Sequence, residues 1–309
     1  MKGGMVQVIS STRLQSVLVG LLITPVALLV FSAPPPVQRA AAAGATDCSA
    51  VALHSDRFPS DPRVGNRFLP YIPGMQFTLS GSVIEDDGSV HPHQVITTVT
   101  DLTKVMAGVR TIVIHDVDVQ DGVVQEAELF FVAQRSDGSV WTLGEYPEEY
   151  DNGKLVGAPS TWVADTARAR AGTAMLAAPK LGTPTYLQGF SPDIQFKDCA
   201  TVVKTNQRTC VATGCYSGVL VIDEFAPFDP AGGHQLKYHA PGVGVIMVAA
   251  AGGVDPEALQ LTRAGRLCAA EFAAVRKQVI EQDKRGYHVA RDIYGATTHV
   301  EQTLSAQTC

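Results

Sequence analysis

The segment from Val95 to Tyr150 places the strongest constraint on how this 309-residue chain can fold. It contains runs rich in β-branched and aromatic residues, a composition typical of strands, and these runs are 95–102, 109–119, 123–133 and 140–143. The turn-forming pairs between them are Ala107-Gly108, Asp121-Gly122 and Asp137-Gly138. Asp-Gly pairs favour tight turns between antiparallel neighbours, because glycine accepts a positive φ without steric cost. The sequence therefore predicts an antiparallel β-meander.

The Asp121-Gly122 pair also suggests a register for the second and third runs. If these two residues form the loop, His115 lies opposite Glu128, and Val117 lies opposite Glu126. In that register His115 shares a face with both glutamates, whereas Asp116 and Asp118 occupy the other face. On each face the apolar run becomes acidic toward the hairpin. A slip of one residue would reverse the faces of one strand, so this pairing is a hypothesis.

Residues 1–45 have the pattern of a signal peptide. Lys2 and Arg13 precede the apolar run 16–33, and the small residues of 40–45 offer a cleavage site. The run is also long enough to span a bilayer, so an uncleaved membrane anchor is the alternative. A proline within the run and the alanines after it favour cleavage. We therefore expect a secreted, extracellular protein that meets a membrane only if this segment stays uncleaved.

All six cysteines lie beyond this segment: Cys48, Cys199, Cys210, Cys215, Cys268 and Cys309. An even number of cysteines in an exported chain indicates up to three disulfides, whose connectivity the sequence leaves open. Three of the cysteines are close in sequence, which predicts one local disulfide loop among them. The cysteine at the end of the chain would fix the C-terminus. A zinc site is disfavoured, because no C-x-x-C spacing occurs.

Further strands are expected along residues 66–263, and a helix is expected over 267–285. The segment 162–180 is ambiguous, because its alanines suggest a short helix whereas its glycine and proline suggest irregular structure. Apolar residues recur at helical spacing from Leu267, and Gly286 is the expected stop signal. We predict a mainly β, antiparallel fold over residues 46–309: one curved sheet or half-barrel of about ten strands, closed or covered by the helix and followed by a tail over 287–309.

The acidic end of the meander is the first candidate site, and its residues are Asp116, Asp118, Glu126 and Glu128, with His115 nearby. Carboxylates that point into a sheet interior need a cation, a hydrogen-bonding ligand or basic residues, because an unpaired buried charge costs several kcal/mol. Oxygen-rich clusters suit Ca²⁺, and paired carboxylates can also perform acid–base hydrolysis. The favoured alternative is that this end of the hairpin projects into water, where the charges are solvated.

Two smaller candidates flank this cluster. His91 and His93 would share a strand face and could bind one metal, although the proline between them favours an edge or loop position. Trp141, Glu145 and Tyr146 combine aromatic and acidic groups where a strand ends, as carbohydrate or cation sites do. The favoured alternative is that both aromatic rings cap the core while the glutamates after them face solvent.

Other function classes are excluded by absent motifs and by charge. The chain has no phosphate-binding loop, no dinucleotide fingerprint and no nucleophile elbow. Its net charge is −6, and signal cleavage would remove basic residues and no acidic ones. An acidic protein of this kind is not expected to bind nucleic acid.

Three segments together resemble a family of exported, actinobacterial-type β-rich proteins: GEYPEEY (144–150), GAPSTW (157–162) and KYHAPGVGV (237–245). The resemblance covers residues 66 to about 290 and implies no assigned activity or catalytic residue. The Pro-Gly-Val-Gly ending of the last segment also looks like the closing strand of exported half-barrel proteins, some of which carry lipids.

Curved sheets of this kind enclose ligand cavities. Our leading hypothesis is therefore a secreted, non-enzymatic binding protein for a lipid-like or other small ligand. The alternatives are a secreted hydrolase or calcium-dependent enzyme that uses the carboxylates, and an envelope interaction module. A cavity would support the first, convergent carboxyls with raised pKa the second, and an exposed apolar patch the third.

Overall fold

Residues 48–85 and 87–309 are described by a computed structural model, and the predicted meander forms four consecutive strands of their sheet. Its strands are longer than expected: β4 (Val90–Met106), β5 (Val109–Gln120), β6 (Val123–Gln134) and β7 (Val140–Asp151). At the β5–β6 turn, Asp121 and Gly122 have φ of 53° and 77°. Both values lie in the left-handed region that a two-residue turn requires. The prediction of an antiparallel meander is confirmed.

The sheet closes into a 12-stranded barrel rather than the open half-barrel that we expected. The other barrel strands are β3 (Met75–Ile84), β10 (Arg170–Met175), β11 (Tyr186–Ser191), β12 (Phe196–Val211), β13 (Gly214–Phe225), β14 (His234–Ala240), β15 (Gly244–Ala251) and β16 (Glu257–Arg266). β3 pairs with β16 at one side, and β10 bridges β7 and β11 at the other. The closing strand β10 comes from the segment 162–180, whose alanines suggested a helix. β10 pairs with the edges of β7 and β11, so the hydrogen-bonding groups of both edges find partners.

The predicted β5–β6 register is wrong by one residue beyond the turn. Gln120 pairs with Val123 as expected, but a β-bulge follows, and Asp118 then lies opposite Glu126. Farther along, Asp116 lies opposite Glu128. A bulge adds one residue to one strand, which shifts every later pair. The consequence is that all four of these acidic residues share one face of the sheet.

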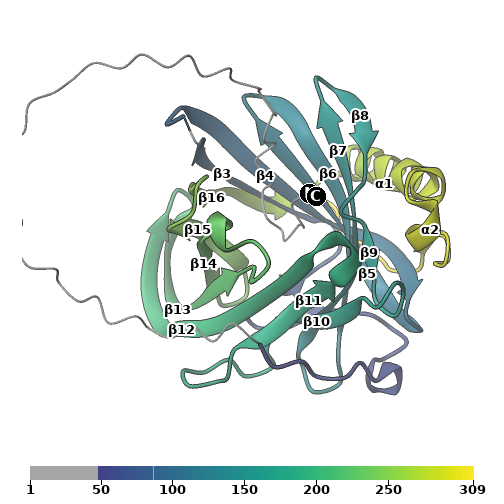
Figure 1. Ribbon diagram of the computed structural model, residues 1–309, viewed down its shortest axis with the longest axis horizontal. Helices are drawn as coiled ribbons and strands as arrows, with labels where there is room; N and C mark the ends of the chain where they lie inside the picture. Colours follow the sequence, from purple (N-terminus) through teal and green to yellow (C-terminus); the bar gives the residue numbers. More distant parts are fainter. Residues whose placement is uncertain (1–47, 86) are drawn as a thin grey trace, which may run out of the picture.

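The helix α1 (Ala269–Val289) lies outside the barrel, beside β4 and β6 (Figure 1). It continues past Gly286, our expected stop, and is followed by α2 (Arg291–Tyr294). A Cβ atom at Gly286 would lie 2.5 Å from the Tyr294 ring. The glycine therefore allows the two helices to pack closely instead of ending the first one. Apolar side chains of α1, α2 and the outer sheet face form a core of their own.

A buried ion pair joins α1 to the barrel wall. Lys104 on β4 is fully buried, and its Nζ donates to Asp283 Oδ1 at 2.7 Å and to Tyr287 Oη at 2.9 Å. The same Nζ lies 4.1 Å from the centre of the Tyr294 ring. A charge that is buried with this many partners is stabilised, whereas either charge alone would be strongly destabilising.

The N-terminal part of the described chain packs against the apolar core of the barrel. The short strands β1 (Val64–Gly65) and β2 (Pro70–Tyr71) form a hairpin, and Val64 and Leu69 join the inner apolar core. The disulfides are Cys48–Cys199, Cys210–Cys215 and Cys268–Cys309. They include the predicted local loop and the fixed C-terminus. The remaining short strands are β8 (Lys154–Gly157), β9 (Trp162–Val163) and β17 (Glu301–Gln302).

The predicted targeting segment, residues 1–45, lies outside the described residues. Within the described part of the chain, no helix combines the length and the apolar character needed to cross a bilayer.

Candidate functional site

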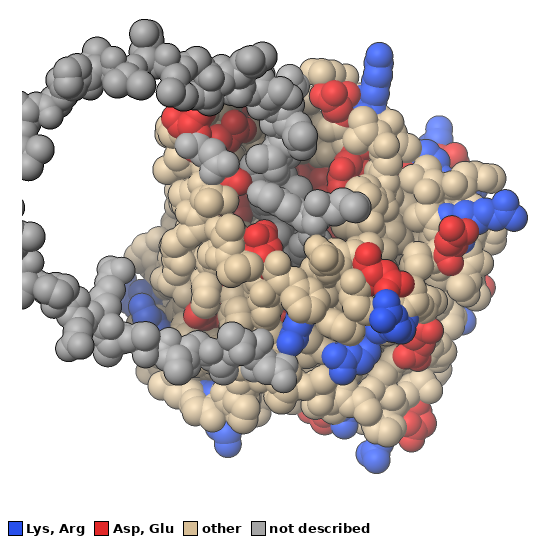
Figure 2. Space-filling model, in the orientation of Figure 1, with Lys and Arg blue, Asp and Glu red and all other residues tan. Residues whose placement is uncertain are grey.

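The inner face of the barrel changes from apolar to acidic along its axis. On β5, Ile112 and Ile114 belong to the inner apolar core, and Asp116 and Asp118 follow on the same face toward the hairpin. Side chains alternate between the two faces of a strand, so acidic residues on several other strands also point into the barrel. The acidic side chains, here called the interior acidic cluster, are Asp116, Asp118, Glu126, Glu128, Glu145, Asp198, Glu224 and Glu257. Figure 2 shows acidic side chains, drawn red, on the upper part of this face of the molecule.

Most of the cluster is buried, contrary to the favoured solvent-exposed interpretation, and Asp116 and Glu126 are partly buried. Glu128 is 4% exposed and Glu145 is 5% exposed. Burial raises the pKa of Glu128 well above its usual value, and the neighbouring Glu145 and Glu126 raise it further. Burial likewise raises the pKa of Glu145 to about 8, even though Trp162 donates a hydrogen bond to its carboxylate. Carboxyl groups in this part of the barrel therefore retain protons at pH values where free carboxyls lose them.

His93 lies between two members of the cluster. Its Nε2 is 2.6 Å from Asp118 Oδ1, and its Nδ1 is 3.0 Å from Glu257 Oε1. Burial would lower the pKa of His93, but the hydrogen bond with Asp118 and the nearby carboxylate of Glu257 raise it to about 9. The imidazole is therefore a buried cation at neutral pH. His93 is not in the predicted loop, because β4 begins at Val90 and continues through Pro92.

Lys237 on β14 supplies the second interior cation. Its Nζ lies 2.6 Å from Glu224 Oε2, across the β13–β14 pair. Burial would lower the pKa of this lysine, but Glu224, Asp198 and Glu257 raise it above its usual value. His93 pairs with Asp118 and Glu257, and Lys237 pairs with Glu224. The other carboxyls of the cluster form no ion pair with a described residue.

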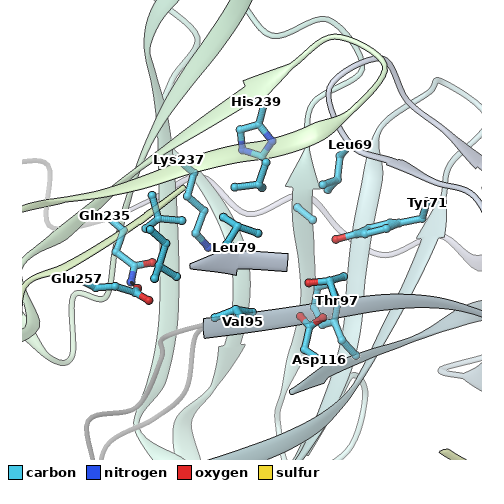
Figure 3. A pocket seen from close by; sticks show the side chains of 15 residues that line it. Leu69, Tyr71, Leu79, Val95, Thr97, Asp116, Gln235, Lys237, His239 and Glu257 are labelled. Carbon is cyan, nitrogen blue, oxygen red and sulfur yellow. Dashed lines mark hydrogen bonds between the residues drawn. The ribbon is translucent and has the colours of Figure 1, made fainter. Parts of the chain in front are cut away.

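A cavity of about 130 Å³ lies beside the cluster. Its apolar wall consists of Leu69, Leu79, Val95, Phe130, Ala174, Val245, Val248 and Leu259. Its polar wall consists of Tyr71, Thr97, Asp116, Gln235, Lys237, His239 and Glu257. Figure 3 shows Gln235, Lys237 and Glu257 on one side of the pocket, and Tyr71, Thr97 and Asp116 on the other. A small molecule here would meet an apolar surface and several buried polar atoms together.

Several polar atoms of this wall have no hydrogen-bond partner within the described part of the chain. Besides Glu257 Oε1, which lies 3.0 Å from His93 Nδ1, they are Asp116 Oδ1, Gln235 Oε1 and His239 Nε2. His239 Nδ1 lies 3.1 Å from the Phe68 carbonyl oxygen, to which only a protonated nitrogen can donate. Burial lowers the pKa of His239 to about 4, so its Nε2 carries a lone pair and no proton at neutral pH. All three unpaired atoms are therefore hydrogen-bond acceptors.

Gln235 has a defined amide orientation. Its Nε2 donates to Glu257 Oε2 at 3.1 Å, which leaves Oε1 as the atom without a partner in the described chain. The reverse orientation would place two oxygen atoms against each other. An unpaired acceptor of this kind costs about 1–3 kcal/mol when it is desolvated, so a donor-bearing ligand or water would stabilise the site.

The structure brings together only some of the residues that the sequence predicted. His115 lies on the outer face of β5, near Gln282 of α1, where burial lowers its pKa to about 4. It is separated from the acidic cluster by the sheet itself. Trp141 and Tyr146 pack in the outer core, Trp141 against Phe58 and Tyr146 against Tyr294 of α2, whereas Glu145 points into the barrel. Adjacent residues on a strand face opposite ways, which divides the predicted aromatic and acidic site between two environments.

The glutamates after Tyr146 also differ from expectation. Glu148 is fully buried and accepts hydrogen bonds from Arg285 of α1 at 2.7 and 2.9 Å. Only Glu149 is near the surface, and it is half-buried. Glu148 thus joins α1 to the barrel wall instead of facing solvent.

Sequence analysis missed much of the polar wall. Gln235, Lys237 and His239 alternate along a run that was recognised as a strand, and a period of two would have placed them on one face. Glu257 on β16 also belongs to this wall. Its position opposite Val83 depends on the long-range β3–β16 pairing, for which the sequence carries no local signal.

A metal site receives no support in the described part of the chain. Among residues 48–85 and 87–309, no three His, Cys, Asp or Glu side chains are arranged to hold a metal ion. Ca²⁺ requires six to eight oxygen ligands. The calcium hypothesis therefore finds no coordinating set among these residues.

No protein-family model matches the chain, and no curated protein matches it. Two solved structures have a similar shape. A Bacteroides fragilis chain, described as a proposed exported protein with a YmcC-like fold, has a TM-score of 0.38 and 13% identity over 65% of this chain and 100% of its own. A Parabacteroides distasonis chain, described as a proposed lipoprotein, has a TM-score of 0.37 and 9% identity over 65% of this chain and 99% of its own. Similarity at this level assigns neither chain's role to this one.

Proposed function

We propose that the protein is an exported, non-enzymatic binding protein that holds a small ligand inside its barrel. The observation that carries this proposal is the cavity, where an apolar wall meets buried acceptors without partners in the described chain. Binding sites commonly combine a mostly apolar lining with a few polar groups that orient the ligand. Export is supported by the signal-like residues 1–45 and by three disulfides, which are typical of oxidising compartments.

The volume of the cavity limits the ligand. Sites for drug-sized ligands measure about 300–1,000 Å³, whereas an apolar cavity of about 150 Å³ holds a molecule the size of benzene. At about 130 Å³ this cavity suits a ligand of few heavy atoms. Of the two ligand types that we expected, the volume therefore favours a small molecule over a lipid chain.

A hydrolase that uses the carboxyls is the second candidate, because several of them have the raised pKa that a general acid needs. Within the described chain, only Asp116 and Glu257 of the cluster line the cavity, and Glu257 is held by His93. The cavity also has little room for a substrate together with an attacking water. These features favour binding over hydrolysis.

Native mass spectrometry of the protein, purified from its producing culture without chelator, tests the proposal. We expect an additional mass of about a hundred daltons. Val248→Phe, which places a ring in the cavity, should remove this mass, and Val156→Phe on the exposed strand β8 should retain it. Circular dichroism and thermal denaturation verify that both variants are folded.

Retention of the mass by folded Val248→Phe would place the ligand elsewhere and contradict the proposal. Wild-type protein without additional mass, which also fails to bind any small-molecule probe, would contradict it as well. Conversion of the ligand to a product during incubation would favour the hydrolase.

A further inference from the structure

The unpaired atoms of the cavity wall point to a ligand rich in hydrogen-bond donors. Asp116 Oδ1, Gln235 Oε1 and His239 Nε2 are acceptors, and none has a partner in the described chain. His239 is 3% exposed, so bulk water does not satisfy its Nε2. A ligand that brought further acceptors to these positions would meet repulsion, whereas N–H groups would satisfy them.

The charge balance of the interior points to a cation. Asp118 and Glu257 flank His93, and Glu224 pairs with Lys237. Asp116 lines the cavity but forms no ion pair with any described residue. A positive group of the ligand beside Asp116 would favour the ionised form of this carboxyl and would offset its charge.

The chemistry of the cavity distinguishes an organic cation from a metal ion. No three potential metal ligands converge among the described residues. In contrast, Leu79, Val95 and Phe130 form an apolar surface in the same cavity as Asp116. A metal ion would leave this surface without contacts, whereas the carbon atoms of an organic ligand would cover it.

We propose that the cavity binds a small organic ammonium ion, a primary amine with a short apolar body, whose N–H groups donate to Asp116. This inference rests on the proposed function, because it names the ligand class of the same cavity. The apolar body of the ligand lies against the apolar wall of the cavity. The ammonium replaces the proton that Asp116 partly retains in the empty cavity.

Release of the Asp116 proton when the ammonium binds can be measured separately from the affinity. Burial raises the pKa of Asp116 to about 6, although Thr97 and Lys237 oppose the shift. A bound ammonium favours the ionised carboxylate, so binding near pH 6 releases part of a proton from Asp116 to the solvent. A neutral ligand of the same shape would release none.

Isothermal titration calorimetry at pH 6 and pH 7 tests the inference with three probes of similar size: n-butylammonium, 1-pentanol and pentanoate. We expect n-butylammonium to bind at least tenfold more tightly than 1-pentanol and pentanoate to show no binding. At pH 6 its binding enthalpy should differ between buffers of unequal ionisation enthalpy, which reports proton release. Calcium chloride alone is a fourth titrant, and we expect no binding.

Asp116→Asn preserves the shape of the side chain and removes its charge. It should weaken n-butylammonium at least tenfold, leave 1-pentanol within about twofold and abolish proton release. Asp292→Asn, at an exposed position of α2, is the matched control and should behave as wild type. If Asp116→Asn does not fold, the preference of the wild-type protein among the probes decides the question.

The outcomes separate the ligand class from the proposed function. Tighter binding of 1-pentanol or pentanoate, abolished by Val248→Phe, would overturn the ammonium assignment and retain the small-ligand function. Calcium binding that Asp116→Asn abolishes would replace the ammonium with a metal ion. A cavity that binds no probe, in a protein purified without any additional mass, holds water only, and this result would overturn both proposals.

Discussion

Replacement of Glu145 by glutamine should make the barrel less sensitive to alkaline pH. Glu145 is 5% exposed, and its carboxylate accepts a hydrogen bond of 2.8 Å from Trp162 Nε1. Burial raises its pKa from 4.5 to about 8. The native state therefore holds this proton more tightly than the unfolded state does. The stabilisation is complete below pH 4.5 and is lost as the pH rises through 8.

The size of the effect follows from the difference between the two pKa values. Each pH unit between them is equivalent to about 1.4 kcal/mol. Between pH 4.5 and pH 8 Glu145 is ionised in the unfolded chain but protonated in the native state. This difference removes about 3 kcal/mol from the free energy of unfolding at pH 7, and about 5 kcal/mol above pH 8, as an upper limit. Glutamine does not ionise and retains an oxygen acceptor for Trp162. The stability of Glu145→Gln relative to wild type should therefore increase from pH 5 to about pH 8 and level off above it.

Denaturant unfolding of the disulfide-intact protein, followed by circular dichroism at each pH, measures this difference. The comparison uses its change with pH, which cancels any constant effect of the new amide. Glu281→Gln, at a solvent-exposed position of α1, is the control and should show no comparable trend. A difference that stays constant across the pH range, or that falls as the pH rises, would refute the reasoning.

Two predictions concern the contact between α1 and the barrel. Lys104→Met should destabilise the protein by about 3–5 kcal/mol in equilibrium denaturation, because the buried carboxylate of Asp283 loses the charge of its lysine partner, and adding Asp283→Asn should recover part of the loss. A double variant no more stable than the single one would contradict this explanation. Gly286→Ala should cost about 1–3 kcal/mol, although alanine normally favours helices, because the new Cβ would lie 2.5 Å from the Tyr294 ring. A stabilised variant in thermal denaturation would show that the two helices can separate without cost.

Local patterns were sufficient to predict the meander. β-Branched runs and turn pairs indicate strands and their antiparallel order, and these depend on neighbouring residues alone. The helix after residue 267 was likewise evident from its apolar spacing. Its end was not, because Gly286 acts through contact with Tyr294, a residue that reaches it only after the chain turns into α2.

The candidate site depends on features that are set at longer range. A single bulge in β6 decides that Asp116 and Asp118 share a face with Glu126 and Glu128, and the residue pattern of the hairpin does not indicate the bulge. Closure of the sheet through β10 then makes that face the inside of a barrel. Burial and raised pKa follow from this closure, because the same residues on an open sheet would face water.

The sequence by itself therefore determined strand identity, the antiparallel meander, the acidic residues at its hairpin end and a cysteine content suited to disulfides. Only the tertiary structure decided which residues face the interior, and that Lys237, His239 and Glu257 meet Asp116 around one cavity. The physical reason is that strand periodicity is local, whereas sheet closure and register join residues more than a hundred positions apart. The chemistry of the cavity comes from these distant pairings.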